Sequence, residues 1–238
     1  MFNLRALCVV ILCGALAPWA HAGRPLGTDD VGTAEAGECQ IEIWAERAAD
    51  QKALVVAPAC GILPGMEIGV DYTKSSPSDG VRGAAGLAFK FAPESWGLKT
   101  GIGELNFGLK LGASWAQPVG AGWQRASSGA LALATLAVND ELTLHLNIGP
   151  ERDRDRASGQ TARLTNLALT WAPHERALVF AEMQSNSKKE VFGGTVRAVG
   201  ARGWLAKDSI GLDLTASRKA RGSGTLWTLG FGWYGLKF

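Results

Sequence analysis

The stretch from Gly224 to Phe238 reads Gly-Thr-Leu-Trp-Thr-Leu-Gly-Phe-Gly-Trp-Tyr-Gly-Leu-Lys-Phe and decides the expected fold. Counted back from its end, every second residue is large and apolar: Phe238, Leu236 and Tyr234. Successive side chains of a β-strand point to opposite faces, so these three share one face. We predict the closing strand of a bacterial outer-membrane β-barrel, with Tyr234, Leu236 and Phe238 as the signal read by the barrel insertion machinery. The alternative is the last strand of a soluble sandwich.

The beginning of the chain has the three parts of a secretory signal peptide. Arg5 provides the basic start, the apolar run Ala6–Ala17 follows, and Ala20–Ala22 is an Ala-x-Ala cleavage site. The apolar run is too short to cross a bilayer as a helix, which needs about 20 residues. We therefore expect cleavage after Ala22 and export of the mature chain.

Composition fits a β-protein of the cell envelope. Of the 238 residues, 31 are Gly and 9 are Trp, which suits a sheet with tight bends and interfacial anchors. The formal charge of +2 offers no basic surface for nucleic acid. We expect residues 1–22 to be the signal peptide, residues 23–38 a periplasmic segment that leads in or folds into the barrel mouth, and residues 39–238 the outer-membrane barrel.

Short alternating runs separated by turn-forming residues fill the chain after Cys39. The clearest run alternates Leu and Phe residues with Glu104, Asn106 and Lys110. Counting such runs predicts an all-β, antiparallel transmembrane β-barrel of about 12 strands, an even number typical of outer-membrane barrels. Alternate connections are long and charged, as extracellular loops are, and the others are tight. The exception is Ala92–Thr100, which is too long for a tight periplasmic turn.

Many charged residues lie on the strand face opposite the apolar stripe, and we predict that they line the lumen. These residues are Glu42, Glu67, Asp71, Arg82, Lys90, Glu104, Lys110 and Arg197. In the dry core of a soluble barrel each unpaired charge would cost several kcal/mol. A water-containing lumen removes that cost, which favours the membrane barrel over the soluble one.

Two cysteines follow the predicted signal peptide, Cys39 and Cys60. If their two strands pair symmetrically about a turn at Ala49-Asp50, the cysteines face each other within bridging reach. Disulfides persist outside the cytoplasm, so we predict a structural Cys39–Cys60 bond.

No group of residues predicts catalysis or metal binding. His145 is the nearest candidate, because an outer-membrane phospholipase of similar size carries a strand histidine with a serine two residues later, but Asn147 occupies that position here. Asp29-Asp30 has no neighbouring His or Cys, which favours a capped turn over a metal site. We expect no catalytic, cofactor or metal residues and no enzyme activity.

The beginning of the mature chain resembles a known family. The stretches Arg24-Pro-Leu-Gly-Thr-Asp-Asp-Val-Gly32 and Gly37-Glu-Cys-Gln-Ile-Glu42 are similar to the opening of the "MetA-pathway of phenol degradation" outer-membrane proteins. The resemblance implies a transporter-like β-barrel for aromatic or other small organic compounds, and it implies no catalytic residue.

Two functions follow from these expectations. The first is a monomeric outer-membrane channel for passive uptake of small solutes, embedded in outer-membrane lipids and lipopolysaccharide. The second is a non-conducting structural or surface-interaction barrel whose lumen is sealed by its own salt bridges. Charged loops such as Arg152–Arg156 have two interpretations. In the simplest one they are only solvated, and in the other they contact lipopolysaccharide phosphates.

Overall fold

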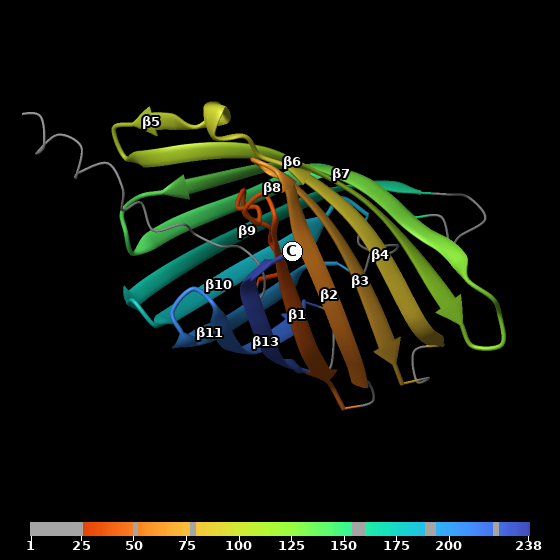
Figure 1. The fold of residues 1–238 in the computed structure, drawn as a ribbon. Helices are drawn as coiled ribbons and strands as arrows, with labels where there is room; N and C mark the ends of the chain where they lie inside the picture. The colour runs from red at the N-terminus through yellow and green to blue at the C-terminus, as the bar shows by residue number, and fades with distance from the viewer. Residues whose placement is uncertain (1–25, 50–51, 77–79, 154–159, 189–193, 221–223) are drawn as a thin grey trace, which may run out of the picture.

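The computed structural model describes residues 26–49, 52–76, 80–153, 160–188, 194–220 and 224–238, so the predicted signal peptide lies outside it. Within these ranges, 12 antiparallel strands form a closed barrel (Figure 1). The strands are β1 (Glu38–Arg47), β2 (Lys52–Leu63), β3 (Met66–Ser75), β4 (Val81–Phe91), β6 (Gly103–Pro118), β7 (Gln124–Ala137), β8 (Leu142–Asp153), β9 (Thr161–His174), β10 (Ala177–Asn186), β11 (Val196–Ala206), β12 (Ile210–Lys219) and β13 (Leu226–Lys237). The predicted fold class is confirmed.

Each barrel strand pairs with the next one along the chain, and β1 pairs with β13 to close the ring. Ile43 of β1 lies opposite Phe231 of β13, so the predicted pairing of the last strand with the first is confirmed. We call the end of the barrel where β1 begins and β13 ends the terminal end, and the opposite end the loop end.

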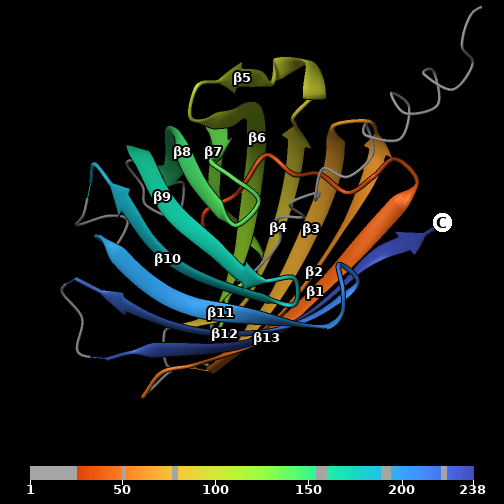
Figure 2. The same cartoon turned by 90° about the vertical axis from the view of Figure 1, so that its left-hand side faces the viewer.

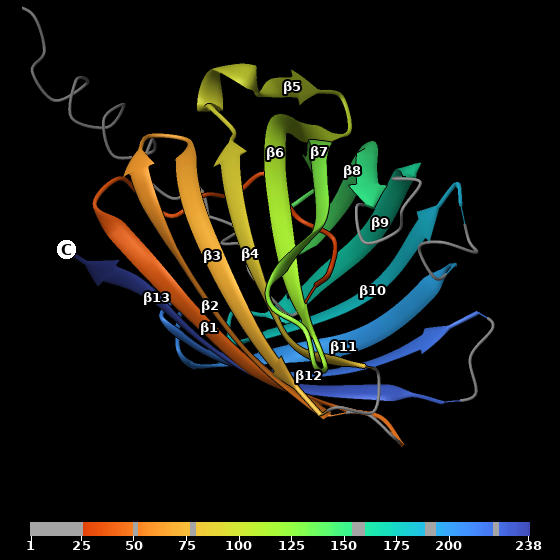
Figure 3. The same ribbon diagram turned by 90° about the vertical axis from the view of Figure 1, so that its right-hand side faces the viewer.

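The long connection between β4 and β6 has a structure of its own. It contains a single 3-10 turn, η2 (Glu94–Trp96), and a short strand, β5 (Leu98–Thr100), which pairs with the beginning of β6. β4 itself pairs with β6, so β5 extends beyond the barrel wall (Figure 3). This explains why the connection is longer than a tight turn.

The outer face of the barrel is apolar, as β9 shows. The inward residues Asn166, Ala168 and Thr170 are buried, and the outward residues Leu167, Leu169 and Trp171 are 41–47% exposed. Apolar side chains that are exposed strand after strand fit a hydrocarbon surrounding better than water. None of the helices in the described residues is long and apolar enough to span a membrane.

A bulge near the end of β13 changes which residues share a face. Gly235 has φ 71°, a conformation that favours glycine, and the pairing of β1 with β13 shifts register between Cys39 and Ile41. Tyr234 consequently points into the barrel and is only 3% exposed, whereas Phe238 is 78% exposed. The expectation that Tyr234 shares one face with Leu236 and Phe238 was wrong, because the bulge adds one residue to the alternation.

The predicted disulfide is confirmed. Cys39 and Cys60 are bonded and are direct partners in the register of β1 with β2. The bond ties the first hairpin together at the terminal end.

Candidate functional site

The chain before β1 turns back into the barrel and crosses its interior (Figure 2). We call residues 26–37 the lumen segment. Thr28, Asp30 and Ala34 are buried, at 3%, 3% and 7% exposure. Gly61 of β2 lets the segment pass, because a Cβ there would lie 2.2 Å from the Ala34 carbonyl oxygen. The sequence left two alternatives for residues 23–38, a periplasmic lead-in or a segment that folds into the barrel mouth. The described residues 26–37 fold into the barrel.

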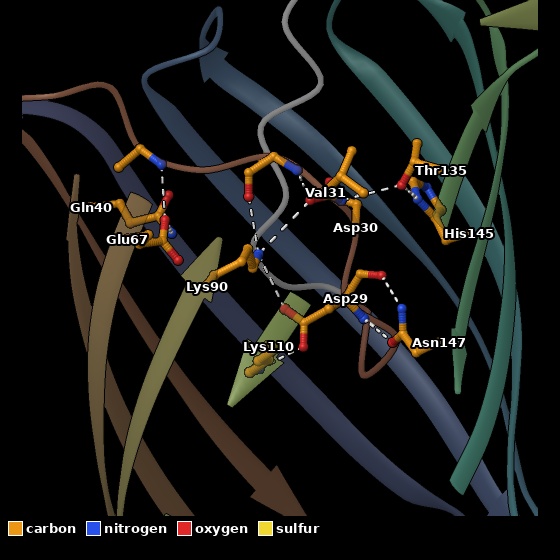
Figure 4. A network of polar contacts seen from close by, with 12 residues as sticks. Asp29, Asp30, Val31, Gln40, Glu67, Lys90, Lys110, Thr135, His145 and Asn147 are labelled. Atoms are coloured by element: carbon orange, nitrogen blue, oxygen red, sulfur yellow. Dashed lines mark hydrogen bonds and ion pairs between the residues drawn. The ribbon is translucent and has the colours of Figure 1, made fainter. Parts of the chain in front are cut away.

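The Asp29 carboxylate is held between two lysines of the barrel wall (Figure 4). Its Oδ1 lies 3.3 Å from Lys90 Nζ, and its Oδ2 accepts a hydrogen bond of 2.5 Å from Lys110 Nζ. Burial alone would raise the pKa of Asp29, but the two ammonium groups outweigh it and lower the pKa to about 2. Asp29 is therefore ionised while the segment is docked.

Lys90 and Lys110 are direct partners across β4 and β6. Like charges in this position repel each other, so the pair is stable only with an anion nearby. Lys90 also donates a hydrogen bond of 3.0 Å to the Gly32 carbonyl and lies 4.0 Å from Asp30.

Asp30 closes a turn inside the segment. Its Oδ1 accepts a hydrogen bond of 2.7 Å from the Gly32 backbone N–H, which is the capped turn expected from the sequence. Burial raises the pKa of Asp30 to about 7, although the nearby Lys90 opposes that rise. Asp30 therefore gains or loses its proton near neutral pH.

Side chains of β7 and β8 bind the backbone of the segment. The Asn147 amide accepts from Asp29 N–H at 2.8 Å and donates to the Asp29 carbonyl at 2.7 Å. Thr135 Oγ1 accepts from Val31 N–H at 3.2 Å, and the His145 ring lies 3.1 Å from the same oxygen. Asn147 is fully buried, so these contacts are sealed from water.

Two carboxylates anchor the ends of the segment. Glu182 of β10 accepts hydrogen bonds of 2.9 Å from the backbone N–H and the hydroxyl of Thr28. Glu67 of β3 accepts one of 2.9 Å from Ala34 N–H. The segment is thus held by polar contacts to β3, β4, β6, β7, β8 and β10.

The wall formed by β1, β11, β12 and β13 carries a separate cluster. Arg202 makes a two-pronged ion pair with Asp213, at 2.5 and 2.8 Å. Tyr234 donates a hydrogen bond of 2.6 Å to Glu42, whose carboxylate lies 3.9 Å from Arg202. The Arg202 guanidinium also lies 5.0 Å from the ring centre of Trp204. This Arg202 cluster fills its side of the lumen.

Open space remains between the lumen segment and the wall formed by β1–β4 and β6. A cavity of about 290 Å³ lies beside the lumen segment and is lined by Trp44, Asp71 and Lys110 among others. A second cavity, of about 220 Å³, shares Asp71, Ala88 and Lys110 with the first and is otherwise lined largely by small residues such as Gly112. The two cavities share these residues of β3, β4 and β6. The first is also lined by β1 and β2, and the second by β7, β8 and β9.

A protein-family model matches residues 9–232, and its description is "Uncharacterised conserved protein UCP029691". The chain belongs to this family. No curated protein matches its sequence.

Solved structures of porins share the fold of this family member. The KdgM porin in complex with disordered oligogalacturonate has a TM-score of 0.60 at 9% identity, with 82% of this chain and 98% of that chain covered. The NanC porin has a TM-score of 0.61 at 8% identity, with coverage of 81% and 98%. At such low identity the likeness shows the fold alone. A closed 12-strand barrel of this type with an apolar outer face belongs in the bacterial outer membrane.

Most of the charged residues expected in the lumen lie on its inner face. Glu42, Glu67 and Lys90 are buried inside the barrel, and Lys110 and Asp71 line the cavities. Glu104 is exposed near the terminal end, and Arg82 is exposed near the loop end.

Arg197 was a wrong assignment. It lies opposite Met183, an outward residue that is 42% exposed, so Arg197 belongs to the outer face. The lumen arginine of β11 is Arg202, which the sequence reading missed. Ala198 and Gly200 are small residues on the inward face, so alternation alone did not distinguish the two faces of β11.

Proposed function

We propose that this protein is an outer-membrane channel for passive uptake of small solutes, and that its lumen segment closes the path. One observation carries the proposal: the two cavities share Asp71, Ala88 and Lys110 of the wall, and the first of them ends against the docked segment at Asp29. With both termini in the periplasm, the segment closes the periplasmic half and the cavities lie toward the outer surface. Hydrogen bonds between neutral groups contribute about 1 kcal/mol each and those to charged groups about 1.5–3 kcal/mol, so the segment undocks only when several of these contacts are exchanged together.

Single-channel recording in planar bilayers tests this function. The mature protein is compared with a variant that lacks residues 26–33, the part of the lumen segment that contacts Lys90 and Lys110. We expect rare, small openings for the mature protein and larger, persistent conductance for the variant. Different migration of boiled and unboiled samples in detergent gels provides the control that the barrel has folded.

A non-conducting barrel is the second candidate, and the Arg202 cluster favours it because that cluster already fills one side of the lumen with paired charges. The deletion variant decides between the two. If it folds and stays silent at every voltage, the channel is excluded and the sealed barrel is supported.

We infer the class of solute and the surroundings from the sequence. The similarity of the opening residues to the MetA-pathway proteins supports small organic compounds, including aromatic ones, as solutes. Liposomes that contain the deletion variant should swell in solutions of such compounds faster than liposomes without protein. We further propose that the protein is a monomer in outer-membrane lipid and lipopolysaccharide, and that the barrel insertion machinery reads Tyr234, Leu236 and Phe238.

A further inference from the structure

We propose that Lys90 and Lys110 form a binding site for the carboxylate group of an anionic solute, and that Asp29 occupies this site as a tethered competitor. The inference deepens the proposed function, because the solute would reach the site through the lumen.

The geometry of the bound Asp29 supplies the first argument. Each oxygen of its carboxylate meets a different ammonium group, Oδ1 that of Lys90 and Oδ2 that of Lys110. Any free monocarboxylate carries the same pair of oxygens at the same spacing. Charge-assisted hydrogen bonds of this kind are stronger than neutral ones, so the pair selects an anion over a neutral molecule of equal shape.

The arrangement of charges supplies the second argument. The two lysines face each other on adjacent strands, and removal of Asp29 takes away the carboxylate that contacts both of them. Glu67 lies opposite Lys90 on β3, but its Oε2 accepts hydrogen bonds from Ala34 N–H and, at 3.4 Å, from Gln40. Asp71 of β3 also interacts electrostatically with Lys110. An anion that enters from the lumen adds to these two wall carboxylates the bridging contact with both lysines that Asp29 supplies.

Access supplies the third argument. The side chain of Lys110 is 30% exposed and lines both cavities, whereas that of Lys90 is 5% exposed. A solute that follows the cavities meets Lys110 first, at the exposed edge of Asp29. Exchange of one carboxylate for the other can begin there while the barrel wall stays intact.

Competition with a tethered group sets the expected size of the effect. The apparent affinity for a free carboxylate falls by the fraction of time that the site is vacant. If Asp29 occupies the site for about 90–99% of the time, its removal strengthens binding by about 10- to 100-fold.

Calorimetric titration of detergent-solubilised protein tests the site, with benzoate as the anion and benzamide as its neutral counterpart. In the full chain, Asp29→Asn removes the competing charge. The variant without residues 26–33 removes the occupant itself, in case the new amide stays between the lysines. In that deletion background, Lys110→Gln removes half of the site, and Arg197→Gln makes the same charge change on the outer face.

We expect the deletion variant to bind benzoate about 10-fold or more tightly than the full chain, with Asp29→Asn in the same direction. Lys110→Gln should abolish the gain, Arg197→Gln should keep it, and benzamide should bind to none. Equal binding of benzoate and benzamide, no gain in the deletion variant, or indifference to Lys110→Gln would each overturn the site. Binding at equilibrium needs no conductance, so a silent barrel that binds benzoate refutes only the channel. A conducting barrel that ignores benzoate refutes only the site.

Discussion

Asp29 and Asp30 are neighbours in the chain, yet their pKa values move in opposite directions when the segment docks. The ordinary value of both is 3.8, and the docked values are about 2 for Asp29 and about 7 for Asp30. Asp29 therefore stabilises docking above pH 3.8 and loses that contribution as pH falls toward 2. Asp30 stabilises docking below pH 3.8, and its contribution declines as pH rises toward 7.

The raised pKa of Asp30 predicts a channel that opens more often as pH rises from about 4 to about 8. Over this range Asp30 must ionise inside the barrel, which weakens docking of the lumen segment. The charged groups around Asp30 are Lys90, Glu67 and Asp29, of which Lys90 alone favours ionisation. Open probability in planar bilayers at several pH values measures the effect. Asp30→Asn should remove the dependence. An unchanged pH profile in Asp30→Asn would assign the dependence to another group.

At the level of strands and hairpins, local sequence was sufficient for most of the fold. Alternation with a period of two predicted the strands, and the Ala49-Asp50 turn predicted the register that brings Cys39 to Cys60. Tyr234 was misplaced because a single bulge at Gly235 reverses the faces. The contacts of Asp29 with Lys90 and Lys110 were beyond sequence patterns, because they join an irregular segment to strands that are distant along the chain.

The first hairpin predicts how the barrel responds to reduction. The Cys39–Cys60 bond closes a loop with a sequence separation of 21 residues. In the chain-entropy description such a loop contributes about 3 kcal/mol to stability. We expect a reductant to lower the temperature at which the compact gel band disappears, although the barrel still folds. The double variant Cys39→Ser/Cys60→Ser should melt at that lower temperature with or without reductant, and identical melting of all samples would contradict the prediction.

Across the whole molecule, the interior is divided into two unequal sides. The Arg202 cluster fills the side formed by β1, β11, β12 and β13. The cavities lie along β1–β4 and β6–β9, with Glu42 of the cluster at the edge of the first, and small residues such as Gly86, Gly112 and Gly129 line the second. A solute path in this barrel therefore runs off the central axis, past the residues of β3, β4 and β6 that both cavities share.

This asymmetry predicts that Gly112→Leu narrows the path. A Cβ at Gly112 would meet only the Leu87 carbonyl oxygen, at 3.8 Å, so the new side chain fits the strand and extends into the cavity. Conductance of the variant without residues 26–33 should fall when this change is added. Gly203→Leu is the matched control, because Gly203 is exposed and a Cβ there meets nothing within 4 Å. Equal conductance of the Gly112→Leu and Gly203→Leu proteins would place the path elsewhere.

The attachment of the lumen segment to the wall has a quantitative consequence. Ala34 N–H is bound to Glu67 five positions after Asp29, and Gly37 donates a hydrogen bond of 2.9 Å to the Gly61 carbonyl eight positions after it, so the tether of Asp29 is short. A group on so short a tether has an effective concentration of roughly millimolar order. A free carboxylate that binds the lysines as tightly as Asp29 does displaces Asp29 only when the carboxylate concentration reaches this effective concentration. A carboxylate that binds more tightly needs a proportionally lower concentration. Opening of the barrel should therefore rise gradually with solute concentration, from mostly shut in dilute surroundings to mostly open where the solute is abundant.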